Sequence, residues 1–588
     1  MLWLHFLQRF IEQQGYSFNG TATGSPFADY LMGTFSSLLL PFGLADNDDI
    51  TTAPSLFVQD RFKVTPRFTA TFGVRWEPNL FWADKHNRID TVKANEQSVV
   101  HPDAPIGIVF PGDPGITKAI VPPEWHSLAP RVGFAWDVFG NGKTSVRGGY
   151  GAYFNQINAD SESQQNAPYS GFLSMYNGDW TNPFATTHTT TMPPVILSGK
   201  FGCTAVSTFP GYNCPLFPLP VFGLLIDGSL RTPYTQAWNL WIQRQISPST
   251  MLEFGYVGNM GIKLNGLLNF NPSVFTPGTT YDSATGMETT ISNPGNDNNR
   301  VRFEPGIISS SSWDLGNDFR SWYHSFQVQI NHRMGHGLSV TSSYTLSKTI
   351  DLCSAICEGC GCVSNPFSIR SVRGRANFDR RNAFVASWLW SPPVKFSDHW
   401  KNELLGGWSF SGITTIQSGA PMTFNNSGLD VAVDGTYAPQ HAFRNGAPIA
   451  TSHPNRGAMI SDFFNTNAFV NPSCTFTPEP GNPQAIEQQN CTPLGIKYNM
   501  LGAFGQSGRN ILSGPALNST DFAVLKDIPV TERTRFQFRA EFFDIFNQTS
   551  FNNPDTGVLD GAAFGTIQGA NQLTSPSRVI QFGLKFFW

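Results

Sequence analysis

The chain ends on Ser577-Arg-Val-Ile-Gln-Phe-Gly-Leu-Lys-Phe-Phe-Trp588, and this stretch decides the fold. Counted back from the C-terminus, every second residue is large and apolar (Trp588, Phe586, Leu584, Phe582, Ile580), and the residues between them are mixed (Phe587, Lys585, Gly583, Gln581, Val579). Successive side chains of a strand point to opposite faces, so the stretch predicts a strand with one apolar face. Soluble domains rarely end on Phe-Phe-Trp. A terminal aromatic on an apolar face is typical of a strand that meets lipid and ends at the membrane–water interface.

The composition agrees with strands that cross a membrane. Only 14% of the 588 residues are charged, against ~25% in an average soluble protein. The mean hydropathy is nevertheless only -0.19, as expected where apolar residues alternate with polar ones. The 50 Phe, 15 Trp and 14 Tyr would suffice for aromatic belts at both interfaces. The formal net charge of -4 argues against a nucleic-acid partner.

The sequence offers neither a membrane-spanning helix nor an export signal. No stretch reaches the ~18–20 continuous apolar residues of a membrane helix. The first residues, Met1 to Gln14, show no basic start, no uninterrupted apolar stretch and no small-residue cleavage site. An exported protein needs such a signal, so we expect this chain to lack its true N-terminus, and we leave residues 1–16 unassigned.

Alternating segments recur in pairs joined by short polar turns. The pair 55–64 and 68–77 turns at Thr65-Pro66-Arg67, and the next pair turns at Gly140-Asn141-Gly142, a strong hairpin signal. Further pairs turn near Pro248, Gly335, Pro392-Pro393 and Pro529, and long irregular segments lie between the pairs: 78–130, 155–232, 260–321, 348–381, 418–518 and 546–576. Bacterial outer-membrane barrels have short periplasmic turns and long extracellular loops. A soluble all-β fold is the alternative.

The inward faces of these strands supply the functional candidates. Residues predicted to face the lumen are Arg75, Glu77, Arg147, Tyr153, Arg535, Gln537, Arg539 and Glu541, whereas Phe536, Phe538 and Phe542 would face lipid. Lumen residues contact water, a plug or a passing solute. The alternative interpretation is that they form ladders of structural hydrogen bonds.

All eight cysteines lie in the long segments: Cys203 and Cys214, then Cys353, Cys357, Cys360 and Cys362, then Cys474 and Cys491. Loops that face an oxidising exterior favour disulfides, so we predict Cys203–Cys214 and Cys474–Cys491 bridges. The central four cysteines could instead form a four-thiolate zinc site, but their spacing is not a standard zinc motif and disulfides are favoured.

No catalytic constellation emerges from the motifs. Gly142-Lys143-Thr144 resembles the end of a phosphate-binding loop, but Asp137 stands where that motif needs glycine. Protease and hydrolase signatures are missing from the sequence. Two Asp/Asn-rich turns, 46–49 and 296–299, could hold calcium, although solvated loops are the favoured interpretation. We expect no enzymatic activity, no cofactor and no metal.

Several segments resemble the Oar-like TonB-dependent receptors: Ser55–Arg67 with Phe72–Glu77, Arg131–Trp136, Gly406–Gly412, Gly508–Asn510, Glu541–Asn547 and Phe582–Trp588. Each is moderately specific, and their order extends the resemblance over residues 17–588. It implies an all-β fold, a transmembrane antiparallel β-barrel in the outer membrane. Family members carry a signal, a regulatory-like domain, a plug with a TonB-contacting box and a 22-stranded barrel.

This chain departs from that pattern, with neither signal peptide nor plug and with thirteen or fourteen predicted strands. We expect residues 17–588 to be an incomplete part of such a barrel, in a receptor for a scarce ligand, with carbohydrate as one candidate. The implied partners are outer-membrane lipid, the barrel assembly machinery, which would read Phe582, Leu584, Phe586 and Trp588, and TonB through a plug absent from this chain. The alternatives are a passive porin-like barrel and a surface adhesion or assembly protein that acts through its loops.

Overall fold

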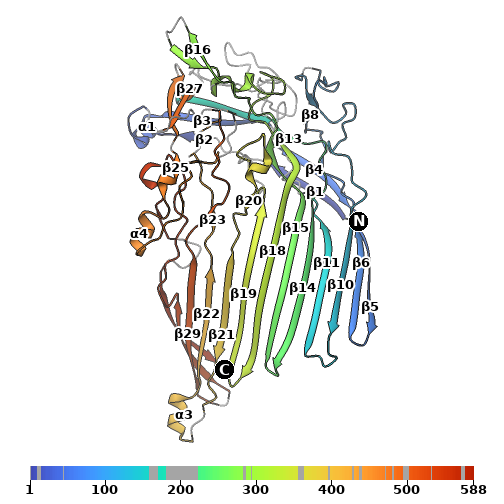
Figure 1. Cartoon of the computed structure of the whole chain (residues 1–588), viewed down its shortest axis with the longest axis vertical. Coiled ribbons are helices and arrows are strands. Elements are labelled where there is room, and N and C mark those ends of the chain that lie inside the picture. The colour runs from blue at the N-terminus through green and yellow to red at the C-terminus, as the bar shows by residue number, and fades with distance from the viewer. Residues whose placement is uncertain are drawn as a thin grey trace.

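The computed structural model describes residues 2–588 except 10–14, 21, 44–45, 103, 158–169, 181–222, 283–286, 293, 355–362, 395–396, 427–429, 433, 436–439, 471, 480–481, 494–501, 532 and 571–576. Its main feature is one curved sheet of fifteen strands (Figure 1). Thirteen of them follow one another as antiparallel neighbours: β5 (Leu56–Thr65), β6 (Phe68–Trp76), β10 (Leu128–Asp137), β11 (Thr144–Phe154), β14 (Tyr234–Ser247), β15 (Thr250–Asn269), β18 (Trp313–Gly335), β19 (Leu338–Asp351), β21 (Asn382–Trp390), β22 (Trp408–Gln417), β29 (Leu517–Pro529), β30 (Arg535–Phe543) and β31 (Val579–Phe587). The remaining two, β13 (Leu224–Ile226) and β20 (Gly374–Arg375), pair beside this path. The predicted antiparallel fold is confirmed.

The sheet is open within the described residues. Among the described strands, β5 pairs only with β6, and β31 pairs only with β30. Every residue of β5 is exposed, and so is every residue of β31 except Gly583. These two strands are therefore the edges of the sheet.

Two boundaries differ from the sequence prediction. The turn between β21 and β22 is not short, because residues 391–407 include the helix α3 (His399–Leu405). In the opposite sense, β15 and β18 continue into the predicted loop 260–321 as far as the Asn269–Trp313 pair. The extension has a physical reason, since Leu267, Trp313 and Leu315 in these strand ends are buried in an apolar cluster.

The register gives the sheet one apolar and one polar face. One row of directly opposite residues runs across six strands: Ile242, Phe254, Val328, Tyr344, Phe384 and Ile416. The adjacent row, which points to the other face, contains Gln243, Glu253, Gln329 and Ser343. Because side chains alternate with a period of two, this register fixes both faces at once.

Large aromatic side chains on the apolar face of the sheet lie over glycines of neighbouring strands. A Cβ atom added to Gly258 would meet the Trp238 ring at 2.5 Å, and one added to Gly412 would meet the Trp388 ring at 2.8 Å. These glycines leave the space that the aromatic rings occupy, and the ring cover compensates for the missing side chain.

The long segments gather at the end of the sheet opposite the short turns (Figure 1). Together with the first 53 residues they form two three-stranded sheets, β1 (Leu2–Arg9) with β4 (Asp46–Ala53) and β7 (Ala83–Asp84), and β2 (Gly15–Ser17) with β3 (Thr34–Gly43) and β12 (Ser170–Asp179). Smaller pairs are β8 (Thr91–Val92) with β9 (Ile108–Val109), β16 (Thr279–Asp282) with β17 (Met287–Thr290), β23 (Pro421–Met422) with β28 (Leu512–Ser513), β24 (Phe443–Arg444) with β25 (Phe469–Val470), and β26 (Pro472–Glu479) with β27 (Asn482–Pro493). The helices here are α1 (Pro26–Met32) and α4 (Arg456–Ser461). We call this part the loop layer.

The loop layer has apolar cores of its own. One cluster buries Phe81, Leu230 and Trp313, and a second buries Phe424 and Phe464. The long segments are therefore packed structures rather than solvated connections.

None of the described helices is both long enough and apolar enough to cross a bilayer.

The Gly508-Arg509-Asn510 segment fastens the loop layer to the end of β19. The guanidinium of Arg509 pairs with the carboxylate of Asp351, and both side chains are less than one tenth exposed. Arg509 Nη2 also donates to the Arg375 carbonyl oxygen at 2.9 Å, and Asn510 Nδ2 donates to the same oxygen at 2.6 Å. Asn510 itself has a φ of 56°, a conformation that asparagine tolerates better than most residues. Two consecutive residues, Arg509 and Asn510, thus connect two distant loops.

A pair of substitutions on β18 tests the assignment of the two faces. Val328→Arg places a charge on the apolar face, where it would destabilise the inserted sheet by ~2–4 kcal/mol near mid-membrane. Gln329→Arg places the same charge on the polar face and should have little effect. The fraction of chain that reaches the outer membrane in a protease-resistant form is the measurement, and equal fractions for the two variants would contradict the assignment.

Arg509→Gln tests the connection between the loops. Breaking a buried ion pair from one side leaves an uncompensated charge and destabilises by ~3–5 kcal/mol, so amide exchange in residues 418–426 and 502–516 should accelerate strongly. Lys93→Gln is the matched control, because the Lys93–Glu96 pair is about 40% exposed on both sides and such pairs contribute ~0–1 kcal/mol. Similar exchange rates in the two variants would show that Arg509 does not fasten the layer.

Candidate functional site

Most of the eight residues predicted to face the lumen form ion pairs or hydrogen bonds with neighbouring side chains. On β6, Arg75 forms an ion pair with Glu77 and donates from Nη2 to Ser55 Oγ at 3.1 Å. On β30, Arg539 Nη2 donates to Glu541 Oε1 at 2.6 Å. These four candidates neutralise one another in pairs.

Gln537 and Arg535 on β30 and Tyr153 on β11 also have local partners. Gln537 Nε2 donates to Asp527 Oδ1 at 3.1 Å, and Arg535 approaches the same carboxylate at 3.9 Å. The Tyr153 ring lies 4.9 Å from the guanidinium carbon of Arg131. These contacts agree with structural hydrogen bonding, and a solute-binding role for these residues stays a prediction.

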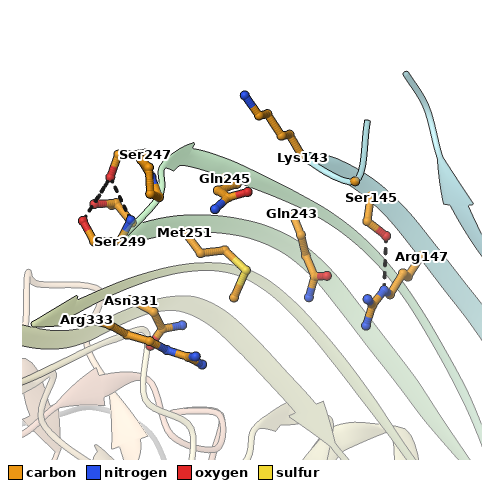
Figure 2. Close-up of a pocket in the computed structure, with 13 residues that line it drawn as sticks. Lys143, Ser145, Arg147, Gln243, Gln245, Ser247, Ser249, Met251, Asn331 and Arg333 are labelled. Carbon is orange, nitrogen blue, oxygen red and sulfur yellow. Dashed lines mark hydrogen bonds between the residues drawn. The ribbon is translucent and has the colours of Figure 1, made fainter. Parts of the chain in front are cut away.

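Arg147, one of the eight candidates, lines a pocket. The pocket has a volume of about 280 Å³ and lies near the short turns of β11, β14, β15 and β18 (Figure 2). Its lining residues are Gly142, Lys143, Ser145, Arg147, Gln243, Gln245, Ser247, Pro248, Ser249, Thr250, Met251, Asn331 and Arg333. The Gly142-Lys143 turn, which resembles part of a phosphate-binding loop, is here a hairpin turn beside this pocket.

Three strands, β11, β14 and β18, project polar side chains to the same side of the sheet in Figure 2, among them Arg147, Gln243, Asn331 and Arg333. All four have odd numbers, opposite in parity to the apolar row that contains Ile242. Sequence reasoning found Arg147 and missed the other three. The signal was present, because period-two alternation away from the apolar row identifies them, but grouping them required the register between strands.

The pocket carries an excess of positive charge. Arg147 Nε donates to Ser145 Oγ at 3.2 Å, and Gln243 Nε2 donates to the carboxylate of Glu253 at 2.9 Å. In the part of the chain that the structure describes, Lys143, Arg147 and Arg333 form no ion pair. Guanidinium groups form strong charge-assisted bonds to carboxylate or phosphate oxygens, so the site is suited to an anionic solute.

An aromatic ring lies next to the pocket on the same face. Trp241 stands directly opposite Arg147 in the β11–β14 register. A Cβ atom added to Gly255 would meet the Trp241 ring at 2.5 Å, so this glycine makes room for the indole. The ring offers an apolar platform beside the charged groups.

The two Asp/Asn-rich turns are not solvated loops, and that expectation was wrong. Asp297 is buried and paired with Arg300, and burial, together with Asp430 and Asp434, raises the pKa of the Asp297 carboxyl to about 8. Asp49 is buried opposite Asp84, and burial together with that carboxylate raises the pKa of Asp49 to about 7. Over the described ranges, no group of three or more His, Cys, Asp or Glu side chains could hold a metal ion.

The cysteines are only in part within the described residues. Cys474 and Cys491 are directly opposite in the β26–β27 ladder, where Cα atoms lie ~4.5–5.5 Å apart, within the span of a disulfide. Their bridge stays a prediction with suitable backbone geometry. Cys353 is disulfide-bonded. The remaining candidates, Cys203, Cys214, Cys357, Cys360 and Cys362, lie outside the described residues.

The proposed assembly residues lie on the outer row of β31. Phe582, Leu584 and Phe586 are 68%, 66% and 44% exposed. The Trp588 ring stacks on Phe586 with 5.8 Å between ring centroids. Recognition by the assembly machinery stays a prediction.

Comparison with known proteins shows the family to which the chain belongs. No curated protein matches the sequence. Similar solved structures include the pyoverdine outer membrane receptor FpvA from Pseudomonas aeruginosa (8% identity, TM-score 0.38, 92% of this chain and 43% of that chain) and the siderophore receptor PirA from Acinetobacter baumannii (9%, 0.37, 92% and 46%). A third is the outer membrane transporter YddB from Escherichia coli (9%, 0.35, 94% and 54%). The chain thus spans about half the length of these proteins. Residues 3–581 match the family described as outer membrane beta barrel domain. The chain belongs to this family, and its sheet is located in the outer membrane.

Proposed function

We propose that the chain is the barrel part of a TonB-dependent receptor that takes up a scarce acidic carbohydrate across the outer membrane. The observation that carries the proposal is the positive, hydrogen-bonding pocket on the inner face, with Arg147 and Arg333 on its two sides. The Oar-like segments support the receptor assignment.

The chemistry of the pocket favours a polyhydroxylated anion over other solutes. The two guanidinium groups would bind a carboxylate by charge-assisted hydrogen bonds. Beside them, the amides of Gln243 and Asn331 can donate to and accept from sugar hydroxyls. Trp241 beside the pocket would cover an apolar face of the sugar ring.

The implied partners act at different parts of the molecule. Lipid would contact the apolar row of the sheet, and the assembly machinery would read Phe582, Leu584, Phe586 and Trp588. Energy coupling in such receptors acts through a plug, so we propose TonB as a partner of the complete receptor only. We expect no enzymatic activity.

Two alternatives have specific support. A polar inner face would equally serve a passive porin-like barrel. The packed cores of the loop layer would suit a surface adhesion or assembly protein that binds its partner through the loops.

Uptake by cells that carry the complete receptor tests the proposal. We expect accumulation of radiolabelled galacturonate but little accumulation of the neutral analogue galactose. A protonophore should abolish the accumulation, because TonB draws on the proton gradient. Arg147→Gln combined with Arg333→Gln should weaken galacturonate binding roughly tenfold or more, the effect of losing charged hydrogen bonds.

A control variant and two further results distinguish the receptor from the porin and the adhesion protein. Arg244→Gln is the matched control, because Arg244 is on β14 but its guanidinium carbon lies 5.8 Å from the Phe139 ring rather than in the pocket. Entry that continues with the protonophore would favour the porin. Absence of uptake, together with loss of surface attachment after removal of the loop 418–516, would favour the adhesion protein.

A further inference from the structure

The helix α3 interrupts the sequence of short turns. It lies between β21 and β22, below the sheet and at the end opposite the loop layer (Figure 1). A connection between two adjacent antiparallel strands needs only a few residues, so the additional helix requires an explanation.

A lysine on the apolar face holds this helix. Lys526 on β29 lies in register between Trp408 on β22 and Phe538 on β30, and Leu584 on β31 continues the row. The other members of this row are apolar, and a charge facing lipid destabilises a barrel. Lys526 is nevertheless only 8% exposed, because α3 covers it.

The ammonium group of Lys526 binds the end of α3. Its Nζ donates to the Glu403 carbonyl oxygen at 2.6 Å and also to the Gly406 carbonyl oxygen. It lies 5.5 Å from the centre of the Trp408 ring. The last carbonyl groups of a helix lack partners within the helix and attract cations. Lys526 therefore fixes the C-terminal end of α3 on the lipid-facing side.

Trp408 and Gly407 add to this attachment. Trp408 Nε1 donates to the Leu404 carbonyl oxygen at 2.9 Å. Gly407 has a φ of 69°, and a Cβ atom there would lie 2.8 Å from the Asp527 carbonyl oxygen, so the close approach of the two strands requires glycine. The Gly406-Gly407-Trp408 segment thus has a local role that the uptake function does not explain.

The rest of α3 exposes apolar side chains. Trp400, Leu404 and Leu405 are 62%, 60% and 51% exposed, and Trp400 and Leu404 share one face of the helix because they are four residues apart. Lys401 is next to them, with its Nζ 5.5 Å from the centre of the Trp400 ring. Tryptophan, leucine and lysine together are typical of helices that lie in the headgroup region of a bilayer.

We propose that α3 is an interfacial anchor, which lies in the phospholipid headgroups at the short-turn end of the sheet and is held there by Lys526. Lipid is the occupant that fits, because α3 is attached directly to the row that already faces lipid. The anchor would fix the depth at which this side of the sheet sits in the membrane.

Photocrosslinking in cell envelopes tests the proposal. Trp400 is replaced by p-benzoylphenylalanine in the full chain, in cells whose phospholipids carry ³²P. Illumination should attach labelled phospholipid at position 400. Lys526→Met should lower that yield roughly tenfold, the effect of losing charged hydrogen bonds, whereas Lys585→Met, on the other face of β31, should leave it unchanged.

Two further probe positions make each outcome decisive. Position 582, in the outer row of β31 and 68% exposed, should always capture phospholipid. Position 125, where Trp125 is 49% exposed within the loop layer, should capture none. A protein adduct or no adduct at position 400, with lipid captured at 582, would overturn the anchor. Lipid captured at 400 independently of Lys526 would overturn the role of that lysine, and failure at 582 as well would overturn the lipid-facing row on which the anchor depends.

Discussion

The pairing of backbone amide and carbonyl groups is the constraint on which this structure depends. Hydrocarbon offers these groups no other partner, so a chain that crosses it as strands must pair each strand with its neighbours. The twelve consecutive antiparallel ladders meet that demand between β5 and β31. Once the ladders are in register, the alternation of side chains follows without further information: the row through Val328 forms the apolar face and the row through Gln329 forms the polar face. The pocket, the aromatic cover over Gly258 and Gly412, and the position of Lys526 are all consequences of that register.

The sequence predicted what depends on local pattern. Each strand pair of the path was recognisable from alternation and from turn residues such as Asn141-Gly142, and the terminal strand from its five alternating apolar residues. Contacts between distant segments could not be predicted in the same way. The raised pKa of Asp297 depends on its burial and on the carboxylates of Asp430 and Asp434, and the Arg509–Asp351 pair joins residues that nothing in the sequence connects. The pocket combines local pattern and distant contacts. The alternation along each strand assigns Arg147 and Arg333 to the polar face, but only the register between strands places them at one site.

The segments that resemble the Oar-like receptors coincide with places where the backbone or a side chain has little freedom. Gly407 needs a positive φ and a close approach to β29, Gly412 leaves space for Trp388, and Asn510 adopts a left-handed conformation while it binds two loops. Such positions restrict the residue type more than an ordinary lipid-facing position does, where any large apolar side chain fits. Short, scattered motifs are therefore what a sheet of this kind is expected to retain when its sequence diverges.

The odd number of strands in the path has a topological consequence. Twelve reversals of direction lie between β5 and β31, so the two edge strands run the same way through the membrane. If the sheet curled until these two edge strands met, they would pair in parallel. A ring made with a second copy in the same membrane orientation would also contain a parallel pair at each of its two junctions. An antiparallel seam on both sides requires an odd number of strands between the edges. The strand directions alone therefore restrict the number of additional strands that could close this sheet into a cylinder.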